Sequence, residues 1–130
     1  MKNVIFTFMF LSSLFCFGQK NNCESVRVGV FKIDVGESPV QVITRNDKYQ
    51  FEEIKEFDYK ARFEINWIDD CTYELLNKKV LQGNLPMEIP KDLIVRIKIL
   101  NVEDDTVTVR CSSNLTDFVA DLKMDIISRE

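Results

Sequence analysis

Two acids and a thiol, Asp69, Asp70 and Cys71, follow an alternating aromatic run that ends at Trp67. Residues of these types could bind a metal ion or act in acid–base chemistry. A zinc site, however, takes four ligands from cysteine, histidine and carboxylate, and the chain contains no histidine. Aspartates between two strand patterns are typical of hairpin turns. The pattern therefore predicts a turn followed by a disulfide cysteine, and no metal site.

The lack of histidine also limits which reactions the chain could catalyse. It excludes Ser-His-Asp and Cys-His catalysis and removes the usual general base near neutral pH. A carboxylate-based hydrolase is our third hypothesis, because acids are plentiful, but on the strand patterns acids alternate outward with lysine and arginine, as on a solvated face. Residues 103–105 lack the spaced oxygens of a calcium loop. We expect no enzyme activity, no catalytic residue and no cofactor.

The first 18 residues have the order of a secretory signal peptide. One lysine is followed by an apolar run and then by the small residues Cys16 and Gly18, and the run is too short for a stable membrane span. We expect cleavage after Gly18, which leaves residues 19–130 as a single domain in the periplasm or outside the cell. Lipidation of Cys16 is a minor alternative, since Phe15 before it is not small.

The charge of the chain argues against nucleic acid as a partner. There are 17 basic and 21 acidic residues, for a net charge of −4, and the basic residues are interleaved with the acids rather than clustered. Such a chain has no electrostatic surface for nucleic acid or for an anionic membrane. We expect no nucleic-acid partner, and no stable membrane span once the signal peptide is removed.

Three cysteines lie beyond the signal peptide, so in an oxidising compartment one pair should form a disulfide and one thiol should stay free. Cys111 shares its parity with Val107 and Val109 and is expected in the core. Cys23 lies outside any strand pattern and Cys71 opens one, which suits a disulfide that ties the N-terminus to the sheet. A Cys71–Cys111 bond is the alternative.

Alternation with period two dominates the rest of the chain and predicts β-strands. It is clearest at Tyr59–Trp67 and Phe118–Ile126. Further strands are expected at Val26–Val35 (with a bulge near Gly29), Val40–Arg45, Lys48–Glu53, Cys71–Leu75, Val95–Ile99 and Val107–Cys111. Residues 77–92, with Gly83, Pro86 and Pro90, are expected to form a long connection that could host a short helical turn.

Eight strands joined mostly by tight hairpins predict an all-β protein, an up-and-down antiparallel meander. Closing the meander into a lipocalin-like barrel removes its exposed edges. A two-layer β-sandwich of the same strands is the alternative fold.

An aromatic set on the strand patterns is expected to face inward. These residues either fill the interior of a small barrel or line a pocket for one apolar molecule, since inward Tyr and Trp carry polar tips that need partners. The candidate pocket residues are Phe31, Tyr49, Phe51, Phe63, Trp67, Tyr73 and Phe118.

Several short motifs resemble a family of small exported proteins from Bacteroidota, some of which carry the label DNA topoisomerase IV. They are Cys23, Gly29-Val-Phe31, the run from Ile43 to Asp47, and the motif Phe63-x-Ile65-x-Trp67-x-x-Asp70-Cys71-x-Tyr73-x-Leu75. The glycine-x-aromatic opening before a meander is also similar to lipocalin-like barrels. The resemblance implies two recurrent cysteines, which match Cys23 and Cys71. We reject topoisomerase activity, because the chain lacks an ATP site, a nucleophilic tyrosine motif and a basic groove.

These observations lead to two main hypotheses on function. In the first, the protein is an exported, non-catalytic binding module for a small apolar ligand or for another component of the cell envelope, for example an envelope protein. In the second, it is a structural or interaction protein with a filled core, which recognises partners through its rim or an uncovered edge strand.

Overall fold

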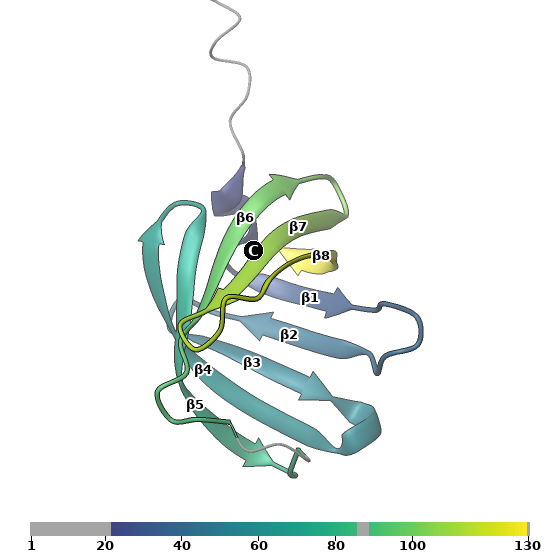
Figure 1. Ribbon diagram of the computed structural model, residues 1–130. Helices are drawn as coiled ribbons and strands as arrows, with labels where there is room; N and C mark the ends of the chain where they lie inside the picture. Colours follow the sequence, from purple (N-terminus) through teal and green to yellow (C-terminus); the bar gives the residue numbers. More distant parts are fainter. Residues whose placement is uncertain (1–21, 86–88, 130) are drawn as a thin grey trace, which may run out of the picture.

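The computed structural model describes residues 22–85 and 89–129, so the predicted signal peptide lies outside the described residues. The chain forms a closed antiparallel barrel in which each strand pairs with the next and β8 pairs with β1 (Figure 1). The predicted all-β meander is confirmed, and the sandwich alternative is wrong. The strands are β1 (Gly29–Ile33), β2 (Gln41–Arg45), β3 (Tyr49–Ile54), β4 (Tyr59–Asp69), β5 (Thr72–Gln82), β6 (Val95–Val102), β7 (Thr106–Ser113) and β8 (Val119–Arg129).

The barrel has two different ends. At one end, which we call the closed end, lie the short turns β2–β3, β4–β5 and β6–β7 together with the 3₁₀ helix η2 (Cys23–Val26). At the other, the open end, lie the longer connections β1–β2, β3–β4 with the 3₁₀ helix η3 (Lys55–Phe57), β5–β6 and β7–β8. Figure 1 shows η2 beside β6 at the top, and η3 and the β5–β6 connection at the bottom. In the described part of the chain, no helix is long and apolar enough to span a membrane.

The predicted turns are confirmed at the closed end. The side-chain oxygen of Asn46 accepts hydrogen bonds from the backbone N–H groups of Lys48 and Tyr49, both at 2.9 Å. The carboxylate of Asp69 accepts one from the N–H of Cys71, also at 2.9 Å, and this bond lowers the pKa of Asp69. The acids before Cys71 thus shape a turn. Within residues 22–85 and 89–129, no three Cys, Asp or Glu side chains gather as a metal site.

A disulfide joins Cys23 to Cys71, with their Cα atoms 5.3 Å apart, as predicted. It fixes η2 against the β4–β5 turn, and Val26 is buried there. Cys111 is the free thiol among the described cysteines and is half-buried. Disulfides of this kind are typical of proteins that fold in an oxidising compartment.

The strand predicted to begin at Val26 begins instead at Gly29, because the preceding residues fold into η2 and cover the closed end. A bulge does occur near Gly29, where the register between β1 and β8 shifts between Val30 and Phe31. A Cβ atom at Gly29 would collide with the backbone carbonyl oxygen of Ser128 on β8. Gly29 is therefore needed where the last strand approaches the first.

The prediction that β5 ends near Leu75 is wrong, because the strand continues to Gln82. Asn77 has a left-handed backbone with φ of 52°, and the register against β4 shifts next to it, from Glu64–Leu76 to Arg62–Lys79. The bulge resets which side chains face inward, so the alternation in the sequence is interrupted there. Beyond Leu75 the pairing of β5 with β6 ends, and the barrel wall opens on that side.

Candidate binding site

The structure places four of the seven predicted aromatic residues in or against the barrel core. Phe31, Phe63 and Tyr73 are buried. Trp67 is half-buried and packs on the core near the closed end, where its ring lies 4.7 Å from that of Tyr73 and beneath the guanidinium of Arg27. For these four residues the predicted inward position is confirmed.

The inward position predicted for Tyr49 and Phe51 is wrong. Their neighbours Gln50 and Glu52 face the interior instead, and Gln50 pairs with buried Phe63 across β3 and β4. Tyr49 lies on the outer surface beneath the guanidinium of Arg62. The cause is the short turn after Arg45, which pairs that inward arginine with Gln50 and so fixes the parity of all β3.

The inward position predicted for Phe118 is also wrong, since its side chain is 73% exposed. Phe118 lies in the β7–β8 connection at the open end, and β8 begins one residue later. The remaining alternation of that strand is confirmed, because Met124 is buried and Leu122 and Ile126 pack against the core.

The barrel interior is mostly filled. A cavity of about 160 Å³ remains in it, lined among others by Gln50, Glu52, Phe63, Tyr73 and Cys111. This volume corresponds to roughly five waters at liquid density and is well below the range of about 300–1,000 Å³ typical of ligand pockets. The interior alone therefore does not have room for a lipid-sized molecule.

A buried arginine occupies the closed end of the interior. Arg45 is 3% exposed and donates hydrogen bonds to the Val26 carbonyl (2.8 Å), the Tyr73 hydroxyl (2.6 Å) and the Gln50 side-chain oxygen (3.2 Å). Its guanidinium also lies 4.8 Å from the ring centroid of Phe31. Burial lowers the pKa of Arg45 and raises that of Tyr73. All of its polar contacts are intramolecular, so this group holds η2 on the barrel.

Two further titratable groups face the interior cavity. Burial raises the pKa of Glu52, and the nearby charge of Lys78 offsets part of that rise. Burial raises the pKa of the Cys111 thiol to about 11, with smaller contributions from Asp121 and Glu52. The thiol is therefore protonated near neutral pH and a poor nucleophile. The expectation that strand acids all face outward is wrong at Glu52.

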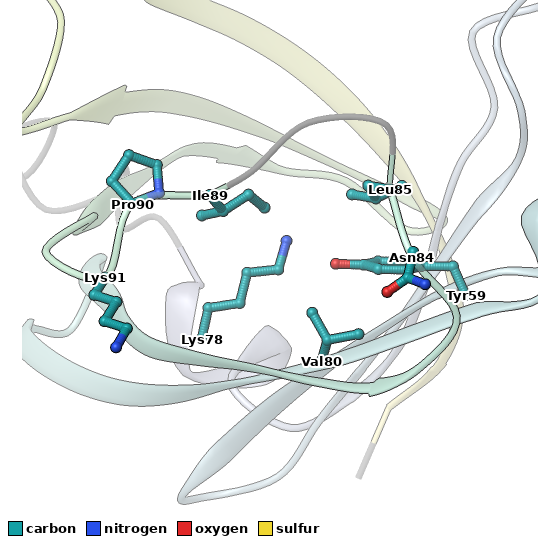
Figure 2. A pocket seen from close by; sticks show the side chains of 8 residues that line it. All are labelled: Tyr59, Lys78, Val80, Asn84, Leu85, Ile89, Pro90 and Lys91. Atoms are coloured by element: carbon teal, nitrogen blue, oxygen red, sulfur yellow. The ribbon is translucent and has the colours of Figure 1, made fainter.

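A pocket larger than the interior cavity lies at the open end, in the gap between β5 and the β5–β6 connection. Its volume is about 690 Å³, within the usual range for small-molecule sites. Figure 2 shows the lining side chains grouped around one space. They are Tyr59, Lys78, Val80, Asn84, Leu85, Ile89, Pro90 and Lys91.

This pocket contains none of the seven residues predicted to line one. The prediction missed Lys78 and Val80 because they follow the Asn77 bulge, in a segment expected to be a loop. It missed Tyr59 because this residue opens the alternating run Tyr59–Trp67, whose apolar side was expected to fill the barrel core. No sequence pattern identifies the site, because Lys78 and Val80 have the opposite parity to Tyr73 and Leu75 on the same strand.

Comparison with known proteins finds no family model, no curated protein and no solved structure that matches the chain. The resemblance to exported Bacteroidota proteins therefore stays a prediction.

Proposed function

We propose that the protein is an exported, non-catalytic binding module that takes a small molecule with an apolar part into the pocket at its open end. Support for export comes from the signal-peptide pattern of residues 1–18 and from the Cys23–Cys71 disulfide, which is typical of oxidising compartments. Support for a binding role rather than catalysis comes from the lack of histidine.

The observation that carries the proposal is the contrast in size between the interior cavity and the open-end pocket. The interior cavity measures about 160 Å³ and the open-end pocket about 690 Å³. Apolar side chains of Val80, Leu85, Ile89 and Pro90 line the larger one. The other four lining residues carry polar or charged groups, so the wall is about half apolar and offers contacts to both parts of a small molecule with an apolar and a polar end.

Titration of the purified mature protein with a dansyl-labelled fatty acid tests the proposal. We expect saturable, one-to-one enhancement of dansyl emission. The dansyl group is a better reporter than Trp67, because Trp67 packs near the closed end, eight residues along β4 from the pocket residue Tyr59. The absence of saturable binding would contradict the proposal.

A matched pair of variants makes this titration specific. Val80 and Ile68 are both about half exposed, at 48% and 47%, so tryptophan should be tolerated at either position. Val80→Trp fills the pocket and should abolish binding, whereas Ile68→Trp at the closed end should leave it unchanged. Equal effects of the two substitutions would count against the pocket.

A second candidate function is an interaction protein that binds a partner, such as an envelope protein, through its open rim. It is favoured by large apolar side chains that are exposed in or beside the open-end connections: Val35, Val40, Phe57, Leu81, Leu115 and Phe118. Native mass spectrometry after mild purification separates the two candidates. A carried small molecule supports the binding module, and a ligand-free monomer that also fails the titration supports the interaction protein.

A further inference from the structure

The open-end pocket carries positive charge in an acidic protein. Its described lining residues include Lys78 and Lys91 and no aspartate or glutamate, although the whole chain has a net charge of −4. Low-dielectric walls strengthen the field of charges inside a cleft. The pocket therefore favours anions over cations and neutral molecules.

Tyr59 supplies an unused hydrogen-bond donor at the same place. Its side chain is 1% exposed, and its hydroxyl has no hydrogen-bond partner among the described residues. Leaving such a buried group unpaired is unfavourable. In Figure 2 this hydroxyl points into the pocket, toward the space that the Lys78 ammonium also enters. An acceptor bound there would satisfy it.

Lys78 is held in position by the barrel rather than by an ion pair. Its ammonium lies 5.4 Å from the ring centroid of Tyr59 and 5.2 Å from that of Phe63, so it faces inward over two aromatic rings. Among the described residues, no carboxylate lies within 4.0 Å of it. Glu52, an acid near Lys78 among the described residues, has its pKa raised by burial. The charge of Lys78 is thus available to a ligand.

From this arrangement we infer that the pocket binds an amphipathic anion. Lys78 and the Tyr59 hydroxyl hold a carboxylate head, and the apolar tail lies against Val80, Leu85 and Ile89. The inference rests on the proposed function and deepens it, because it names the ligand class and the two residues that recognise its charged end.

Calorimetric titration with dodecanoate and with its uncharged analogue dodecanol tests the inference at concentrations where both are monomeric. We expect dodecanoate to bind at least tenfold more tightly, since hydrogen bonds to charged groups contribute about 1.5–3 kcal/mol. Lys78→Gln should reduce dodecanoate affinity about tenfold and leave dodecanol affinity unchanged. Tyr59→Phe should act in the same direction.

Lys79→Gln is the matched control. Lys79 is next to Lys78 in the sequence, but on the sheet it lies opposite Arg62 of β4, on the outer face. It should leave both affinities unchanged. Equal binding of dodecanoate and dodecanol, or equal losses in Lys78→Gln and Lys79→Gln, would overturn the charged-head assignment while leaving the binding function intact. Binding of neither compound would instead remove the proposed function, and this inference with it.

Discussion

The two ends of the barrel are built in opposite ways. At the closed end, a disulfide ties down a 3₁₀ helix, and Arg45 pairs with the Val26 carbonyl, the Tyr73 hydroxyl and the Gln50 side chain. At the open end, β5 loses its β6 partner, the Tyr59 hydroxyl has no partner among the described residues, and a pocket of about 690 Å³ separates β5 from the next connection. Satisfied polar groups stabilise a fold, whereas unsatisfied ones beside a hollow are typical of binding sites.

The same contrast separates two positive charges that both face inward. Arg45 donates hydrogen bonds to Val26, Gln50 and Tyr73. Among the described residues, Lys78 lies near two aromatic rings and near Glu52, whose pKa burial raises, and it forms no ion pair. Arg45 is therefore a structural residue and Lys78 a ligand-binding candidate. Substitutions at the closed end should therefore lower the stability of the fold, whereas substitutions at the open end should weaken ligand binding.

The largest effect should come from removing the disulfide. Cys23→Ala with Cys71→Ala opens a loop with a sequence separation of 48 residues, which costs about 4 kcal/mol in the chain-entropy model. Urea unfolding should show this loss, while dodecanoate affinity of the folded fraction stays the same. A change below about 0.5 kcal/mol, within the ordinary range for surface substitutions, would mean that η2 contributes little to closing the barrel.

Arg45→Met should be the next most damaging change. It leaves the Val26 carbonyl and the Tyr73 hydroxyl without their donor in a buried site, and we expect a loss of about 3 kcal/mol. The control is Arg62→Met, which removes a guanidinium from above Tyr49 on the outer face and should cost about 0.5–1 kcal/mol. Equal losses would contradict the structural role of the closed-end group.

Glu52→Gln should give a smaller, pH-dependent gain. Because burial raises the pKa of Glu52, the folded state binds its proton more tightly than the unfolded chain does. That stability is fully present below the ordinary glutamate pKa of 4.5 and is lost as pH rises through the raised value. The variant and the wild type should therefore be similarly stable at acidic pH, and the variant more stable at pH 8.

Urea unfolding at several pH values measures this difference. Glu53→Gln is the control, because Glu53 is paired with Lys60 at 3.7 Å on a partly exposed surface, where such pairs contribute little. A stability difference between Glu52→Gln and wild type that is independent of pH would argue against an inward Glu52.

Phe118→Ser should have the smallest effect on stability. At 73% exposure the ring buries little surface, so the free energy of unfolding should stay within about 0.5 kcal/mol of wild type. Thermal unfolding is sufficient to check this. A marked destabilisation would mean that the ring packs on the barrel after all.

The barrel itself could be predicted from the sequence because alternation and turn residues repeat along most of the chain. Tyr59–Trp67 has one phase throughout and folds as expected. The failures occur where a single residue shifts the phase: the turn after Arg45 decides that Gln50 rather than Tyr49 faces inward, and Asn77 resets the alternation before Lys78. Side-chain hydropathy does not predict which side of β3 faces inward, nor the change of phase at Asn77, because each depends on the backbone register.

The candidate site was harder to predict for a related reason. Its polar members, Lys78 and Tyr59, look like an ordinary surface lysine and an ordinary core aromatic in the sequence. Their proximity arises from pairing between β4 and β5 and from the early end of the β5–β6 ladder. A search limited to inward aromatic residues therefore found the core rather than the pocket.

The most direct test of this account is an amide chemical-shift titration of the ¹⁵N-labelled protein with dodecanoate. The account predicts that shifts cluster at the open end, around Tyr59, Lys78 and Leu85, while Val26, Arg45 and Tyr73 stay unchanged. Shifts centred on the Arg45 end, or none at saturating ligand, would contradict it.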